Sequence, residues 1–191
     1  TANAYNEEQL ALIDEPLHRF EAKIRGNFPE YSYPTEVQLE LKKGAQVMFI
    51  RNDSEAGFYN GKIGKVSEIG ANGVVSVTDS DGLTIAVSPV EWTHSQYVLN
   101  DESGEIEQSV VGTFKQLPLR IAWAITIHKS QGLTFDKVII DAGAAFAFGQ
   151  VYVALSRCRT LEGISLDSPI RTSTIYSDMH VSDFNDSIQA E

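Results

Sequence analysis

Two segments in the last third of the chain contain the side chains best suited to binding phosphate. Residues 125–136 read ITIHKSQGLTFD, and residues 149–159 read GQVYVALSRCR. In each segment a hydrophobic run leads into a cluster of small, polar and basic residues. Hydroxyl, imidazole, ammonium and guanidinium groups all donate hydrogen bonds that phosphate oxygens accept. The pattern is typical of loops at the end of an α/β sheet that meet a nucleotide or a nucleic acid.

The first segment is predicted to place its polar side chains on one exposed turn. They are Thr126, His128, Lys129 and Ser130. An imidazole can also stack on a nucleic-acid base. Gly132 follows, and the absence of a Cβ there lets the backbone N–H approach a phosphate. A polar helix cap that ends at a glycine explains the same residues, so both interpretations stay open on the residues alone.

The second segment contains two arginines, Arg157 and Arg159. A guanidinium is planar, permanently charged and forked, which suits a γ-phosphate whose negative charge is redistributing. Alternatively, both arginines only neutralise the C-terminus of a helix predicted over residues 147–157, an effect of about 0.3–1 kcal/mol. Cys158 between them is interpreted as a half-buried packing residue, because no His–Asp arrangement accompanies it.

Together the two segments closely resemble motifs V and VI of superfamily 1 DNA helicases of the RecD-like and PIF-type branch. The strings LKKGAQVMFIRND (41–53) and NGKIGKV (60–66) resemble the start of that family's inserted barrel and its first hairpin. The resemblance covers residues 1–170. It implies an α/β RecA-like partial domain with a parallel sheet, interrupted by a small all-β SH3-like barrel.

The resemblance also implies roles for the polar residues of the first segment. Single-stranded DNA would be contacted by Thr126, His128, Lys129 and Ser130. Gln131 and Gly132 would lie on the ATP side of the turn. Thr134 departs from the family pattern, which often has Glu at this position in contact with the nucleotide ribose. A ribose contact through Thr134 is therefore not expected.

Arg157 occupies the motif VI arginine position, which implies an arginine finger. No GxxxxGK[ST] phosphate loop occurs in the chain, so the loop and the Mg²⁺ ligands are expected in a missing N-terminal RecA-like domain. The implied parent is an ATP-dependent DNA helicase with 5′-to-3′ polarity that binds ATP and Mg²⁺, neither of which this segment would hold alone. The alternative is a non-catalytic adaptor that binds nucleic acid or protein, which an intact Arg157 disfavours.

Composition restricts the remaining possibilities. The 191 residues carry a formal net charge of −11, which alone argues against nucleic-acid binding, because phosphate contacts need local positive charge. However, residues 118–171 hold six Lys or Arg and four Asp or Glu, whereas the rest of the chain holds nine basic and 22 acidic residues. The segment with the motifs is thus the least acidic part.

A cytoplasmic protein is expected, because the sequence shows no targeting signal and has a single cysteine. No apolar run approaches the roughly 20 residues that a membrane helix needs, and the first residues lack the features of a signal peptide. The single cysteine excludes an internal disulfide and fits a reducing compartment. No His or Cys residues have the spacing of metal ligands, so no metal site is predicted.

Hydrophobic periodicity and the resemblance to helicases together predict four parts. The resemblance implies that residues 1–41 are the N-terminal part of the RecA-like domain, and their pattern predicts one or two short helices over residues 5–25. Residues 42–116 alternate with period two between Asn-Gly and Asp-Gly turns, which predicts five or six strands and a small barrel. Four of the predicted strands are 47–50, 62–69, 74–78 and 83–87. In residues 117–170 the hydrophobic pattern predicts strands at LRIAWA, KVIID and GISL and the helix over 147–157. Residues 171–191 are a C-terminal tail.

Overall fold

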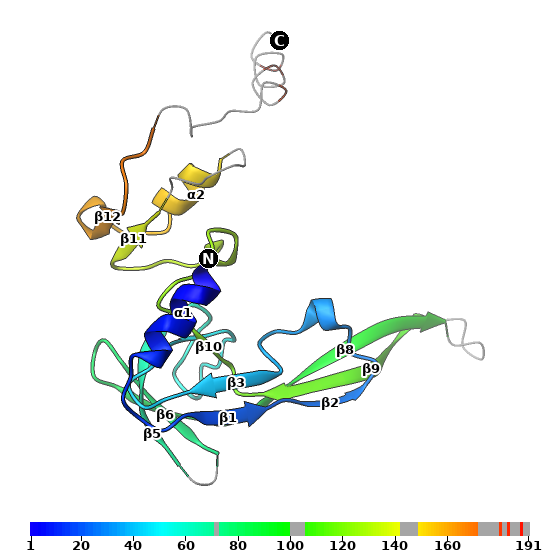
Figure 1. Cartoon of the computed structure of the whole chain (residues 1–191). Helices are drawn as coiled ribbons and strands as arrows, with labels where there is room; N and C mark the ends of the chain where they lie inside the picture. The colour runs from blue at the N-terminus through cyan, green and yellow to red at the C-terminus, as the bar shows by residue number, and fades with distance from the viewer. Residues whose placement is uncertain are drawn as a thin grey trace. The chain divides into compact units, whose positions relative to one another are not determined.

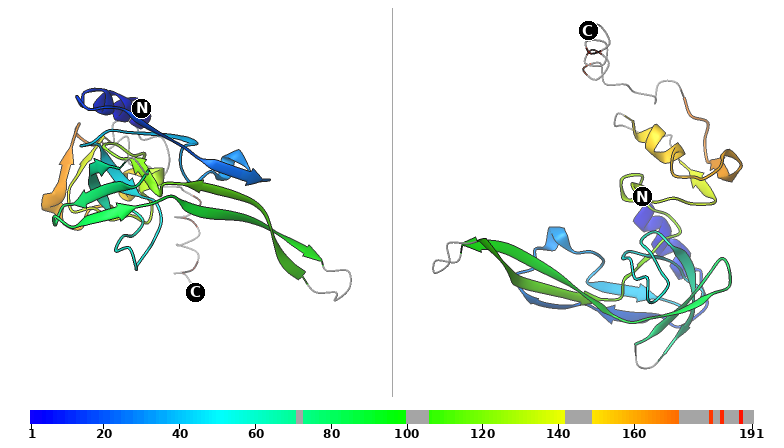
Figure 2. Two further views of the ribbon diagram at one scale, coloured as in Figure 1. Left: turned by 90° about the horizontal axis from the view of Figure 1, so that it is seen from below. Right: turned by 180° about the vertical axis from the view of Figure 1, so that it is seen from behind.

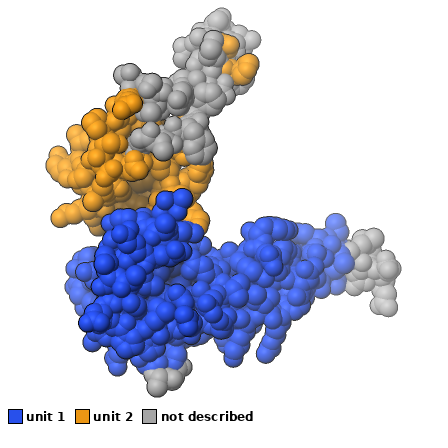
Figure 3. Space-filling model, viewed as in Figure 1, with its two compact units in different colours: residues 1–124 blue, residues 125–191 orange. Residues whose placement is uncertain are grey.

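The computed structural model describes residues 1–70, 73–99, 106–141 and 149–171, together with His180, Asp183 and Ile188. The chain divides into two compact units, Thr1–Ala124 and Ile125–Glu191, which have different colours in Figure 3. Each unit has its own hydrophobic cluster. Most of the predicted tail, residues 171–191, lies outside the described residues. No helix of the described part is long and apolar enough to cross a membrane.

The first unit begins with helix α1 (Ala2–Ala11), which is joined to the end of the same unit. The Asn6 side chain makes two hydrogen bonds to the backbone of Ala124, in which Nδ2 donates to the carbonyl and Oδ1 accepts from the amide, both at 2.8 Å. Leu10 is the buried residue of the helix and joins the core cluster. One polar and one apolar contact therefore anchor α1.

The next segment corrects the prediction of helices over residues 5–25. The prediction holds only for the part within α1, because the chain then forms β1 (His18–Glu21) and β2 (Lys23–Gly26). Strand β1 pairs antiparallel with β3 (Gln38–Leu41), and β2 pairs antiparallel with β9 (Ile106–Gln116). The spacing of Leu17, Phe20 and Ile24 suits a helix, but partner strands distant in sequence override that local preference.

The largest sheet has five antiparallel strands in the order β10-β4-β5-β6-β7. Their bounds are β4 (Gln46–Phe49), β5 (Ile63–Ile69), β6 (Val75–Asp79), β7 (Thr84–Val87) and β10 (Leu119–Ile121). Alternate residues face the core, as period two requires. Examples with at most 5% exposure are Val47, Phe49, Val75, Val77, Ile85 and Val87. The strands predicted within residues 46–87 are therefore confirmed.

The described strands form no closed barrel. Strand β8 (Val90–Leu99) pairs with β9 along its whole length, and the other edge of β9 takes β2. Figures 1 and 2 show these strands as a long ribbon beside the five-stranded sheet. Pro89 and Pro118, which cannot donate a backbone hydrogen bond, lie where the chain enters β8 and leaves β9. The two longest strands are therefore used in the ribbon and do not close the sheet.

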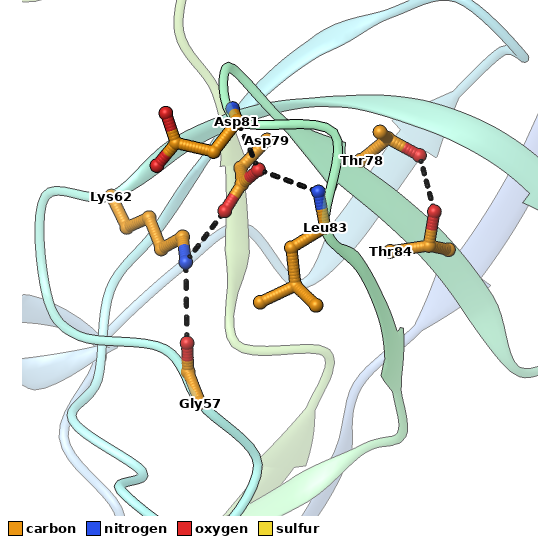
Figure 4. A network of polar contacts seen from close by, with 7 residues as sticks. All are labelled: Gly57, Lys62, Thr78, Asp79, Asp81, Leu83 and Thr84. Atoms are coloured by element: carbon orange, nitrogen blue, oxygen red, sulfur yellow. Dashed lines mark hydrogen bonds and ion pairs between the residues drawn. The ribbon is translucent and has the colours of Figure 1, made fainter.

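A buried ion pair fastens the β6–β7 hairpin to the loop before β5 (Figure 4). Lys62 Nζ lies 2.8 Å from Asp79 Oδ2, and the two side chains are 14% and 4% exposed. Lys62 also donates to the Gly57 carbonyl at 3.3 Å. The other carboxylate oxygen of Asp79 accepts from the backbone amides of Asp81 and Leu83, both at 2.9 Å. The hydrogen bond from Lys62 is the largest effect that lowers the pKa of Asp79.

The second unit is a small α/β arrangement. Its elements are η2 (His128–Ser130), β11 (Val138–Ile140), α2 (Gln150–Leu155), η3 (Leu161–Gly163) and β12 (Ile164–Leu166). Strands β11 and β12 pair in parallel, which confirms the parallel strand predicted at KVIID and the strand predicted at GISL. The prediction of a strand at LRIAWA is right for β10, but this strand pairs antiparallel with β4 in the first unit.

Candidate functional site

The two motif segments lie side by side in the second unit. The Phe135 amide donates to the Arg157 carbonyl at 2.8 Å, and the Arg159 amide donates to the Phe135 carbonyl at 3.0 Å. Phe135 and Cys158 thereby form a parallel bridge. The Cys158 thiol also donates to the Asp136 carbonyl at 3.4 Å. Residues more than 20 positions apart in the sequence, Phe135 and Arg157 to Arg159, thus share one short backbone ladder.

Gly163 explains how closely the chain packs beside this ladder. A Cβ at Gly163 would lie 2.1 Å from the Asp136 carbonyl oxygen and 2.6 Å from Cys158 Sγ. Both distances are too short for any side chain, so only glycine fits. The start of β12 therefore packs directly against the place where the two motif segments meet.

Local hydrogen bonds shape the turn of the first segment. The Ser130 amide lies 3.1 Å from the carbonyls of both Thr126 and Ile127. The Lys129 amide donates to the Thr126 hydroxyl at 3.3 Å, so this side chain partly caps the turn. The turn continues through Gln131, whose amide donates to the His128 carbonyl at 3.3 Å.

The predicted DNA-contact residues divide into an exposed group and a buried one. Thr126, His128 and Lys129 are exposed. Ser130 is only 6% exposed, and its hydroxyl donates to the Ile127 carbonyl at 2.7 Å. A hydroxyl has a single hydrogen, so Ser130 has none left for a phosphate oxygen in this conformation.

The predicted nucleotide-side residues, Gln131 and Gly132, are both exposed. Gly132 has φ +77°, a left-handed conformation that favours glycine. A Cβ built at Gly132 would meet no atom within 4 Å. The backbone around Gly132 is therefore open on the side that a side chain would otherwise cover.

Arg157 is half-buried, and its guanidinium makes three hydrogen bonds. Nε donates to the Val153 carbonyl at 3.0 Å, and Nη1 donates to the Leu133 carbonyl at 3.2 Å. Nη2 donates to the Ser156 hydroxyl at 2.9 Å. The Val153 contact is the helix-end interaction that the alternative interpretation expects. The Leu133 contact links the arginine to the chain that leaves the polar turn.

Arg159 has a different environment. It lies on the surface and forms an ion pair with Asp136, with Nη1 3.1 Å from Oδ1 and exposed side-chain fractions of 61% and 75%. Exposed pairs of this kind contribute roughly 0–1 kcal/mol. Its contact lies along the backbone ladder, so Arg159 stabilises the junction of the two segments only weakly.

Comparison with known proteins identifies the family. The family described as UvrD-like helicase C-terminal domain matches residues 121–161, which include both motif segments. The chain is 33% identical over 216 residues to the ATP-dependent DNA helicase Pif1 of Psychrobacter sp. (strain PRwf-1). This match covers 86% of this chain and 32% of that relative. The structure of unliganded Pif1 from Bacteroides sp matches with a TM-score of 0.89 and 42% identity, covering 99% of this chain and 43% of that one.

The chain matches the C-terminal portion of Pif1-type superfamily 1 helicases. The match confirms the predicted resemblance and the predicted helicase C-terminal RecA-like fold. Bacteroides Pif1 in complex with ADP-AlF3 and ssDNA also matches, with a TM-score of 0.77, 42% identity, and coverage of 99% of this chain and 43% of that one. The chain spans about a third of the length of the Psychrobacter relative.

Sequence reasoning missed some residues of this candidate site. Ser156 and the Leu133 carbonyl both hold the Arg157 guanidinium, and neither was predicted. For Ser156 a signal was present, because a hydroxyl directly before the candidate arginine is within hydrogen-bond reach of it. For Leu133 no signal exists in the sequence, since any residue supplies a backbone carbonyl.

Proposed function

We propose that this chain is the C-terminal part of an ATP-dependent DNA helicase that supplies single-stranded DNA contacts and an arginine finger. The relatives named above are ATP-dependent DNA helicases, and one was solved with ADP-AlF3 and ssDNA. The observation that carries the proposal is the 3.2 Å hydrogen bond from Arg157 Nη1 to the Leu133 carbonyl. It joins the proposed finger to the segment that leads from the proposed DNA contacts.

Arg157 retains donors for a nucleotide. A guanidinium has five N–H groups, and three of them are used by the contacts to Val153, Leu133 and Ser156. One N–H on Nη1 and one on Nη2 have no partner among the described residues. ATP, when bound, supplies the phosphoanhydride bond that is hydrolysed. Arg157 would offer its two remaining N–H groups to the γ-phosphate as that bond breaks.

The exposed side of the polar turn is our proposed DNA contact. Thr126, His128 and Lys129 present hydroxyl, imidazole and ammonium groups to solvent, and such groups bind phosphate oxygens or stack on bases. We assign Ser130 to the same site, where its hydroxyl holds the turn through the Ile127 carbonyl. Gln131 and Gly132 follow directly and are proposed to face the nucleotide, with the open backbone of Gly132 approaching a phosphate.

The intact protein would add what this chain does not contain. We propose that an N-terminal RecA-like domain holds the phosphate loop, ATP and Mg²⁺, and that translocation along the single strand runs 5′ to 3′. Residues 1–41 and 117–170 would form the second RecA-like domain, with the insertion over 42–116 between them and a tail after residue 170. The five-stranded sheet would be an open form of the SH3-like module. A single cysteine supports a cytoplasmic location.

Replacement of the proposed finger tests the function. Arg157→Ala in the intact helicase should lower DNA-stimulated ATP hydrolysis roughly 10³-fold, because an arginine finger supplies 10³–10⁵ in kcat. Binding of a fluorescent oligo-dT should change less than about threefold, since Arg157 contacts no exposed residue of the proposed DNA site. The measurements are steady-state phosphate release and fluorescence anisotropy.

Arg159→Ala is the matched control. Arg159 lies two residues away, has the same charge and forms only a surface ion pair, so ATP hydrolysis should stay within about threefold of wild type. Wild-type hydrolysis by the Arg157→Ala protein would contradict the arginine-finger assignment. Absence of DNA-stimulated ATP hydrolysis by the intact wild-type protein would instead favour a non-catalytic adaptor that binds nucleic acid or protein.

A further inference from the structure

The hydroxyl of Ser156 lies between two groups that fix its orientation. Ser156 Oγ is 3.0 Å from the Val153 carbonyl oxygen and 2.9 Å from Arg157 Nη2. A carbonyl only accepts and a guanidinium only donates. The hydroxyl must therefore donate to Val153 and accept from Arg157, so both hydrogen-bonding directions are determined.

These contacts form a closed cycle at the end of helix α2. Arg157 Nε donates to the same Val153 carbonyl at 3.0 Å. Two neighbouring N–H groups of the guanidinium are thus bound on one side: the one on Nε by the Val153 carbonyl, and the one on Nη2 by the Ser156 hydroxyl. A guanidinium is planar, so holding one edge sets the direction of the opposite side. The Leu133 carbonyl adds a third contact through Nη1.

We propose that Ser156 is a positioning residue for the catalytic arginine. It fixes the edge of the Arg157 guanidinium that faces α2, so that one N–H on each terminal nitrogen stays aimed away from the helix. Such a pair of N–H groups is what a bidentate contact to two phosphate oxygens requires. The inference rests on the proposed function, because it assigns a role to Ser156 only if Arg157 contacts the γ-phosphate.

The chemistry separates a positioning role from a merely structural one. Ser156 is exposed, and its hydroxyl contacts only the carbonyl of its own helix and the arginine among the described residues. Removing the hydroxyl therefore removes no core packing. A guanidinium that keeps only the Val153 and Leu133 contacts spends less time in the productive orientation. The loss should therefore appear in the catalytic step and not in folding or in ATP binding.

The test compares Ser156→Ala with Ser156→Thr in the intact helicase. We expect Ser156→Ala to lower kcat of DNA-stimulated ATP hydrolysis about 10-fold, with KM for ATP within about threefold of wild type, because a hydrogen bond to a charged group is removed. Ser156→Thr keeps a hydroxyl on the same carbon and should restore kcat to within about threefold. The unfolding temperature and oligo-dT affinity of both variants should match wild type.

Ser165→Ala is the control for removal of an exposed hydroxyl from the same unit, and its kcat should equal that of wild type. A wild-type kcat for Ser156→Ala would overturn this inference. A loss that Ser156→Thr fails to restore, or that comes with a lower unfolding temperature, would overturn it too. These failures leave the proposed function standing if Arg157→Ala is inactive, whereas an active Arg157→Ala protein removes both.

Discussion

Among single residues, Asp79 shows how a carboxylate is used to hold a turn. Its two oxygens accept hydrogen bonds from Lys62 and from the amides of Asp81 and Leu83. These bonds favour the charged form, with the bond from Lys62 the largest, and together they outweigh desolvation, so the pKa lies below its ordinary value of 3.8. One side chain thereby joins the β6–β7 turn to the loop before β5.

The stabilisation by Asp79 should depend on pH in a defined direction. Because the pKa is lower in the folded than in the unfolded chain, the contribution is complete above 3.8 and is lost as the pH falls through the folded pKa. Asp79→Asn should therefore lower the free energy of unfolding at pH 7, and the difference from wild type should shrink below pH 3.8. Urea unfolding followed by tryptophan fluorescence measures both values.

Asp81→Asn is the matched control. Asp81 contributes its backbone amide to the turn, and the substitution keeps that amide, so the free energy of unfolding should match wild type at pH 7. An Asp79→Asn difference that grew in acid would have the wrong sign and would contradict the assigned cause.

At the level of secondary-structure elements, a single buried side chain connects several strands of the first unit. Gln116, at the end of β9, is 2% exposed. Its Nε2 donates to the Phe20 carbonyl at 2.7 Å and to the Val37 carbonyl at 3.2 Å, and its Oε1 accepts from the Leu117 amide at 2.9 Å. The end of β9 is thus tied to β1 and to the segment before β3.

Gln116→Leu should destabilise the chain by roughly 2–4 kcal/mol, because it leaves the buried Leu117 amide and the part-buried Phe20 and Val37 carbonyls without this partner. Urea unfolding of the 191-residue chain is the measurement. Gln108→Leu is the control, since Gln108 is an exposed residue on the same strand, and it should change the free energy by less than about 0.5 kcal/mol. Equal effects of the two substitutions would refute the role given to Gln116.

At the scale of the whole molecule, the central question is what the chain does alone. It has no phosphate-loop sequence and spans about a third of a full-length relative. An arginine finger, the role that we propose for Arg157, acts on a nucleotide that other residues hold. The proposal therefore gives Arg157 no substrate in this chain alone.

We therefore expect purified residues 1–191 to show no ATP hydrolysis above background, with or without oligo-dT. Phosphate release at saturating ATP and Mg²⁺ is the measurement, and an intact Pif1-type helicase is the positive control. Turnover that an added chelator abolishes would mean that the chain holds a nucleotide site of its own. The proposal that another domain holds ATP and Mg²⁺ would then be wrong.

Much of the architecture followed from local pattern. Alternation and Asn-Gly turns located β4 to β7 within a residue or two, and the apolar run at KVIID predicted a parallel strand. Residues 18–25 were predicted as helix and are strands, because their partners β3 and β9 lie far along the chain. The described strands also do not close into the predicted barrel, because β8 and β9 form their hydrogen bonds with each other.

For the candidate site, the sequence alone determined the family and the residue types, because motif strings record which side chains the chemistry needs. Only the tertiary structure decided how those side chains are used. It buried the Ser130 hydroxyl against Ile127, and it placed the Arg157 guanidinium on Leu133, Val153 and Ser156. The physical reason is that a hydrogen bond depends on distance and direction between atoms. Residues as far apart in sequence as Leu133 and Arg157 acquire both only when the chain is folded.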